Sequence, residues 1–116
     1  MVTPSVGAVV VLPFPFSDLS GSKVRPGIVL AEVGMDDWIL CQVTSNPYSD
    51  PAAIRVEQAD FQTGSLQRTS YARPGKLFTA NSTLMVRQAG QLSPGKVSEI
   101  IAAVVAQFRS PSPPAP

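Results

Sequence analysis

The stretch Phe14–Leu30 reads F-P-F-S-D-L-S-G-S-K-V-R-P-G-I-V-L and joins two apolar segments through a polar loop. The loop covers Ser17–Lys23, and the second apolar segment covers Gly27–Leu30. Pro26 disfavours the helical region for the residue before it, so we expect Arg25 to be extended at the start of a strand. An arginine fixed beside a hydroxyl-rich loop suits an anion such as phosphate, because its guanidinium is a rigid fork of donors. The alternative is a solvated charge beside a turn.

The composition indicates one domain with a modest core. The chain has 116 residues, of which 44% are hydrophobic, and a net charge of +1. We expect a single domain over residues 1–109 and a disordered proline-rich tail over residues 110–116. The low net charge excludes nucleic-acid binding through bulk charge alone. A local basic site is still possible if cations converge in the fold, and the candidates are Lys23, Arg25, Arg68, Arg73, Lys76 and Arg87.

Several classes of site are excluded by residue counts. There is no histidine, so catalysis by a Ser-His or Cys-His pair and a histidine metal site are ruled out. The single cysteine, Cys41, lies in an apolar run and is expected in the core, as in a reducing compartment. We therefore expect no metal and no cofactor. The first residues have no signal-peptide pattern, and no run could span a bilayer, so we expect a cytoplasmic protein without membrane contact.

The pattern of apolar runs and turn residues predicts a mainly β fold. Strands are expected over Val6–Leu12, Gly27–Glu32 and Trp38–Thr44, and the second and third form a hairpin around the turn Gly34–Asp37. Further short strands are expected over Ala53–Val56 and Lys76–Thr79, with Leu66–Arg73 an edge strand at best because it ends at Pro74. A turn or a short helical turn is expected over Asp60–Gly64, and a turn over Ala80–Thr83. A last strand starts at Leu84–Val86 and continues or closes at residues 89–92.

A single helix is expected over Ser93–Phe108. Ser93 can cap it and Pro94 suits its first position, and apolar residues follow the spacing of one helical stripe. That stripe is core, or a mixture of core and dimer interface. Many short strands with one closing helix indicate a small antiparallel β-barrel rather than a parallel sheet.

The predicted hairpin brings Arg25 and Thr44 together. Arg25 begins one strand and Thr44 ends the next, and in an antiparallel hairpin these ends lie at the same edge of the sheet. Two polar loops hang over that edge. The alternative for Thr44 is an ordinary strand residue whose hydroxyl is bound to backbone.

A guanidinium and a hydroxyl suffice for one reaction, the cleavage of RNA by its own 2′-hydroxyl. The nucleophile belongs to the substrate, so the protein must position it and stabilise charge on the phosphorane. We assign Arg25 and Thr44 as candidate catalytic residues. Single-stranded RNA is held by polar contacts and by stacking on aromatic rings. The candidate RNA-binding residues are Asp18, Ser20, Ser22, Lys23, Gln42, Ser45, Tyr48 and Arg73.

These segments resemble the PemK/MazF toxins of bacterial toxin–antitoxin pairs. The resemblance runs from about Gly7 to Phe108 and is carried by R-P-G-I-V-L, Q-V-T-S, Y-S-D-P, the segment G-S-L-Q-R-T-S-Y-A-R-P-G-K-L-F-T and the closing L-S-P-G-K helix. It implies an SH3-like β-barrel shared with the CcdB gyrase poisons, and a homodimer. It also implies metal-independent, sequence-selective cleavage of single-stranded RNA to 2′,3′-cyclic phosphate and 5′-hydroxyl ends. The family's catalytic arginine and threonine fall on Arg25 and Thr44.

The resemblance also implies a cognate antitoxin protein that folds across the RNA groove. Two alternatives stay open within the same fold. One is a non-enzymatic gyrase poison of the CcdB type, and the other is an inactive interaction domain. Neither requires the pairing of Arg25 with Thr44.

Overall fold

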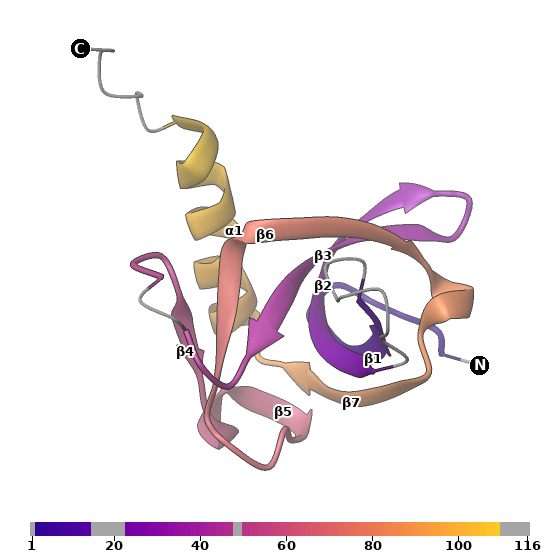
Figure 1. Ribbon diagram of the computed structural model, residues 1–116, viewed down its shortest axis with the longest axis horizontal. Helices are drawn as coiled ribbons and strands as arrows, with labels where there is room; N and C mark the ends of the chain where they lie inside the picture. The colour runs from indigo at the N-terminus through magenta and orange to yellow at the C-terminus, as the bar shows by residue number, and fades with distance from the viewer. Residues whose placement is uncertain (1, 15–22, 48–49, 110–116) are drawn as a thin grey trace.

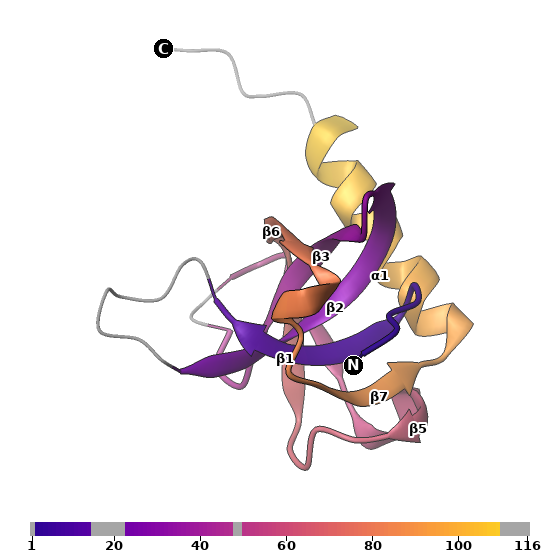
Figure 2. The same ribbon diagram turned by 90° about the vertical axis from the view of Figure 1, so that its right-hand side faces the viewer.

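The computed structural model describes residues 2–14, 23–47 and 50–109. In these ranges seven strands form one antiparallel sheet in the order β4-β6-β3-β2-β1-β7-β5, and one α-helix packs against it. The sheet curls on itself, with α1 standing beside it (Figures 1 and 2). The predicted mainly β fold, a small antiparallel barrel-like sheet with a C-terminal helix, is confirmed. The elements are β1 (Ala8–Pro13), β2 (Val24–Gly34), β3 (Asp37–Thr44), β4 (Ile54–Val56), the 3-10 turn η1 (Gln58–Asp60), β5 (Phe61–Gly64), β6 (Ser70–Asn81), the 3-10 turn η2 (Ser82–Leu84), β7 (Arg87–Leu92) and α1 (Pro94–Arg109).

The hairpin of β2 and β3 forms as the sequence predicts. Gly34 pairs with Asp37 across a two-residue turn in which Met35 and Asp36 have φ values of 57° and 63°. Positive φ at both central residues is the geometry that matches the twist of a hairpin. Both strands run further than predicted, since β2 begins at Val24 and β3 at Asp37.

The core has two parts, one on each side of the sheet. Val10 and Leu12 of β1 pack in one cluster with Phe78 of β6. The rings of Phe78 and Phe14 are packed edge to face, with their centroids 4.6 Å apart. Val9 belongs to the other cluster, which lies against α1. Because β1 is buried on both faces, its sequence is a continuous apolar run rather than an alternating one.

The helix starts where the sequence predicts. The backbone N–H of Lys96 donates to Oγ of Ser93 at 3.4 Å, so Ser93 caps the helix through a long hydrogen bond. Ile100 is fully buried in the core, whereas Val105 and Phe108 are 38% and 79% exposed. The predicted stripe is thus core in its first half and open in its second. Over the described ranges, no helix is long and apolar enough to cross a membrane.

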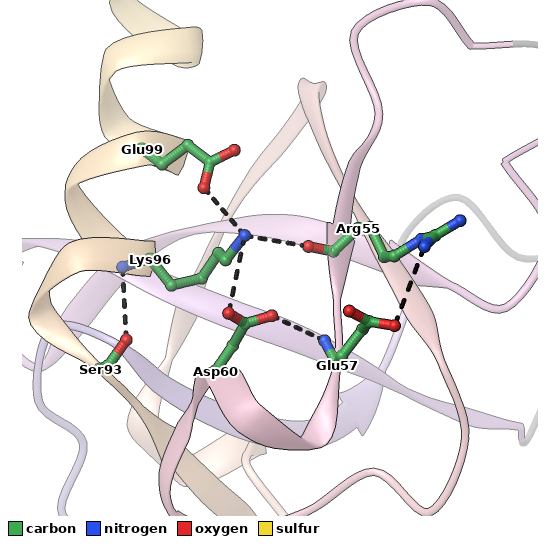
Figure 3. A network of polar contacts seen from close by, with 6 residues as sticks. All are labelled: Arg55, Glu57, Asp60, Ser93, Lys96 and Glu99. Carbon is green, nitrogen blue, oxygen red and sulfur yellow. Dashed lines mark hydrogen bonds and ion pairs between the residues drawn. The ribbon is translucent and has the colours of Figure 1, made fainter.

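A polar network connects α1 to β4 and to η1 (Figure 3). Nζ of Lys96 donates to Oε1 of Glu99 at 2.8 Å and to the carbonyl of Arg55 at 3.2 Å, and lies 3.8 Å from Oδ1 of Asp60. The other oxygen of Asp60 accepts from the backbone N–H of Glu57 at 2.8 Å. The Lys96 side chain is only 14% exposed, so these contacts fix how the helix sits on the sheet.

The turn or short helical turn expected over Asp60–Gly64 is wrong for Phe61–Gly64, which is strand β5. Only Asp60 lies in a helical turn, as the last residue of η1. Gly64 pairs with Gly90 of β7, and a Cβ added to either residue would lie within 2.6 Å of backbone atoms of the other strand. This close approach gives a short edge strand its partner, and the sequence of the strand alone does not reveal it.

The break expected at Pro74 is also wrong, because β6 runs without interruption from Ser70 to Asn81. Its first residues lie between β3 and β4 rather than at an edge. The ladder shifts register there, since Gln42 pairs with Arg73 but Cys41 pairs with Leu77. Pro74 falls inside that irregularity, where no ladder hydrogen bond needs its missing N–H.

The end of β6 differs from the expected turn over Ala80–Thr83. Asn81 still pairs with Asp37, and its side-chain oxygen then accepts from the backbone N–H of Thr83 at 3.1 Å. This contact starts η2, which occupies Leu84, so β7 begins at Arg87 and not within Leu84–Val86.

Candidate active site

The β2–β3 hairpin places Arg25 and Thr44 at one end of the sheet. Gly27 pairs with Gln42, so two residues further toward the open end Arg25 comes opposite Thr44. Both residues line one cavity of about 370 Å³. Arg25 and Thr44 therefore lie close together, as the sequence predicts. Their catalytic role stays a prediction.

The cavity is rich in positive charge. Its polar lining consists of Arg25, Thr44, Ser45, Arg68, Ser70 and Arg87, and none of the described residues that line it is acidic. Three arginines lining one hollow favour an anionic ligand. Arg68 and Arg87 were absent from the predicted site, although both belong to the six cations considered able to converge.

Tertiary structure brings these two arginines to the site. Arg25 pairs with Leu12 on one side of β1, and Arg87 pairs with Val11 on the other. Arg68 arrives differently, on the connection between β5 at one edge of the sheet and β6 near the other edge. The curl of the sheet brings that connection over the same end of the barrel.

The hydroxyl of Thr44 already has partners. It donates to the carbonyl of Asn46 at 3.0 Å, and it accepts from the backbone N–H of Asn46 at 3.2 Å. This is the backbone-bound alternative weighed for an isolated threonine. The bonds are local and solvent-accessible, so exchanging one for a phosphate oxygen costs only about 1 kcal/mol.

Gln42 and Arg73 do not line the cavity. Nε of Arg73 forms an ion pair with Oδ2 of Asp50 at 2.9 Å, and its Nη1 donates to Oε1 of Gln42 at 3.4 Å. The hydrogen bond from Arg73 and another from the backbone of Ala52 hold the pKa of Asp50 below its usual value. Arg73 thus links Asp50 to Gln42 of β3. RNA contact by Gln42 or Arg73 stays a prediction.

The remaining predicted site residues divide into two groups. Ser45 lines the cavity, and Lys23 is exposed just before β2 but does not line it. Asp18, Ser20, Ser22 and Tyr48 lie outside the described residues.

Cys41 is a core residue, as predicted. It is fully buried, and burial raises the pKa of its thiol to about 12, so the thiol stays protonated at neutral pH. Within the described ranges, no three Asp, Glu or Cys side chains come together as metal ligands would.

No protein-family model matches the sequence, and no curated protein matches it. Solved structures do match its fold. An endoribonuclease from a mycobacterial species, solved with its cognate antitoxin, is 18% identical with a TM-score of 0.69, over 96% of this chain and 100% of that one. MazF from Deinococcus radiodurans is 16% identical with a TM-score of 0.69, over 95% of this chain and 100% of that one. The toxin MazF-mt6 of Mycobacterium tuberculosis is 14% identical with a TM-score of 0.68, over 90% of this chain and 99% of that one.

These matches span nearly the full length of both chains, so they concern the whole domain and not a shared fragment. At identities below 20% they are a statement about fold. The resemblance to the PemK/MazF toxins seen in the sequence is confirmed at the level of three-dimensional structure: this chain has the MazF fold.

Proposed function

We propose that this chain is the toxin of a toxin–antitoxin pair and acts as a metal-independent endoribonuclease on single-stranded RNA. The observation that carries the proposal is the cavity in which Arg25 and Thr44 meet, with Arg68 and Arg87 beside them. Solved proteins of the same fold are described as endoribonucleases, which supports this chemistry over a binding role. We propose sequence-selective cleavage that leaves a 2′,3′-cyclic phosphate and a 5′-hydroxyl.

Charge stabilisation is the main task of the site. As the 2′-oxygen bonds to phosphorus, negative charge builds on the phosphoryl oxygens before the bond to the 5′-oxygen breaks. The planar guanidinium of Arg25 can donate two parallel hydrogen bonds to those oxygens. Thr44 would hold the phosphate through its hydroxyl after exchanging its contact with Asn46.

The protons must also be accounted for. The 2′-hydroxyl loses one proton, and the leaving 5′-oxygen gains one from water. Among the described residues that line the cavity, none is a base that titrates near neutral pH. We therefore propose that the proton of the 2′-hydroxyl passes to solvent.

We propose two protein partners, a second copy of the chain and a cognate antitoxin. The structure from the mycobacterial species and one from Deinococcus radiodurans contain a toxin with its antitoxin, which supports the second partner. An antitoxin segment rich in carboxylates would complement the three arginines of the cavity.

The gyrase-poison alternative has no observation in its favour among these structures. We place the activity in the cytoplasm, where single-stranded RNA is available.

The test is cleavage of a long single-stranded RNA by the purified protein in EDTA, with DNA of the same sequence beside it. We expect discrete RNA fragments and intact DNA, since DNA lacks the 2′-hydroxyl. Arg25→Ala should lower the rate by at least about a hundredfold, the scale for removing one preorganised charge-stabilising donor. Cleavage that requires added divalent metal would contradict the mechanism.

The matched control is Arg109→Ala, which removes an exposed arginine at the end of α1, away from the cavity. It should leave the rate unchanged. Circular dichroism must show that each variant is folded. A folded wild-type protein that cuts no RNA, with or without metal, would refute the proposed function.

A further inference from the structure

A second cavity adjoins the first. It has a volume of about 280 Å³ and is lined by Gln58, Phe61, Leu66, Gln67, Arg68 and Thr69. Leu66 and Arg68 also line the cavity of Arg25 and Thr44, so the two hollows share a wall. A polymer whose phosphate occupied the first cavity would have its next unit close to the second.

The lining of the second cavity differs in chemistry from that of the first. It has one guanidinium, at the shared wall, and otherwise an aromatic ring, an aliphatic side chain, two amides and a hydroxyl. An aromatic face with amide and hydroxyl groups around it is the combination that binds an unstacked base, by stacking and by hydrogen bonds to its edge. The volume is close to the lower end of small-ligand sites, about 300 Å³.

Two contacts hold this cavity in shape. The ring of Phe61 lies over Gly90, where an added Cβ would be 2.8 Å from a ring carbon, so only glycine leaves the ring in this position. Nε2 of Gln58 donates to the carbonyl of Gly64 at 3.1 Å and holds the start of the connection that carries Gln67. Gln67 itself has a φ of 67°, an uncommon conformation that fixes where its side chain leaves the backbone.

We propose that the second cavity is a nucleobase subsite. It receives the base of a nucleotide next to the scissile phosphate, and Gln67 and Thr69 select that base through hydrogen bonds. Arg68 contacts the phosphate between the two cavities. This inference rests on the proposed function and adds to it the part of the chain that sets sequence selectivity.

The test compares cleavage of a randomised RNA library by wild type, Gln67→Asn and Thr69→Val, with the cut sites read by sequencing. Asparagine tolerates positive φ, so Gln67→Asn shortens the reach of the amide without straining the backbone. Each variant should reduce the preference at one position beside the cut by about twofold to tenfold, the scale of one hydrogen bond. Total cleavage of the library should remain.

The matched control is Gln62→Asn, on exposed residue Gln62 of β5, which lines neither cavity. It should leave the cut-site preference unchanged. If both variants keep the wild-type preference at every position, or if wild type cuts without preference, the subsite is refuted while the nuclease activity stands.

A second measurement separates the subsite from the activity. Short 2′-O-methyl RNA, which cannot be cleaved, is titrated into the wild-type protein while backbone amide signals are followed by NMR. We expect shifts at Phe61, Gln67 and Thr69 together with shifts at Arg25. Shifts at Arg25 alone would refute the subsite, and shifts at both cavities in a protein that cuts nothing would support the subsite and refute the proposed function. The absence of any shift would refute both.

Discussion

The ion pair of Asp50 and Arg73 should make the stability of this protein depend on pH in a way that one substitution removes. The two side chains are 15% and 22% exposed, and Nε of Arg73 lies 2.9 Å from Oδ2 of Asp50. The other oxygen of Asp50 accepts from the backbone N–H of Ala52 at 2.9 Å. Asp50→Asn keeps the shape of this contact and removes its charge.

The magnitude follows from the burial of the pair. A hydrogen bond to a charged group contributes about 1.5–3 kcal/mol, and an exposed ion pair about 0–1 kcal/mol. This pair is mostly but not fully shielded from solvent, and Asn retains part of the hydrogen bonding. We therefore expect Asp50→Asn to lower the free energy of unfolding at pH 7 by about 1–2 kcal/mol.

The sign of the pH dependence follows from the lowered pKa of Asp50. A carboxylate whose pKa is lower in the folded state stabilises the protein above its unfolded pKa of about 3.9. That contribution is lost as the pH falls through the folded pKa. The difference between wild type and Asp50→Asn should thus be complete near pH 7 and shrink toward zero in strong acid.

Urea unfolding at several pH values between 7 and 2.5 measures this difference. Glu32→Gln, which neutralises an exposed carboxylate on β2, is the control and should show no comparable loss at pH 7. A difference between wild type and Asp50→Asn that is the same at every pH would refute the reasoning, as would no loss at pH 7.

Three further predictions concern the sheet, the helix and the reaction. Gly64→Ala should lower the melting temperature by several degrees, because φ is +73° and the added Cβ would lie 2.1 Å from the carbonyl oxygen of Ala89; calorimetry that shows no change would contradict it. Lys96→Met should lower the free energy of unfolding by about 1–2 kcal/mol in chemical denaturation, because it leaves Asp60 and a backbone carbonyl without their cation; an equally stable variant would mean that the network is dispensable. The cleavage rate should rise with pH without a step near pH ~6.5, because the chain has no histidine and the proton of the 2′-hydroxyl passes to solvent. A plateau in that pH profile below neutrality would indicate a carboxylate base.

Local sequence was enough for the parts of the site that lie on one hairpin. Pro26 fixes an extended Arg25, and a short turn forces β2 and β3 to pair in opposite directions, so Thr44 had to arrive beside Arg25. The helix was also readable, because its cap and its apolar period lie within a few residues of each other.

Local sequence was misleading where a distant segment decided the outcome. Phe61–Gly64 has no strong strand pattern and forms β5 by pairing with β7, whose Gly90 leaves room for the close approach. Pro74 reads as a strand end, yet it falls in a register shift against β3 that no stretch of β6 could reveal. Propensity is a weak guide wherever pairing with a remote strand sets the conformation.

The sequence by itself determined a mainly β domain with a C-terminal helix, the pairing of Arg25 with Thr44, and the exclusion of histidine chemistry. Each of these depends on residues close together along the chain or simply on their absence. Only the tertiary structure decided that Arg68 and Arg87 join that pair, that Arg73 is bound to Asp50 instead, and that a second cavity lies beyond Arg68. The reason is the curl of the sheet, which brings residues from separate strands to one end of the barrel, and the closing of that curl depends on contacts between remote segments.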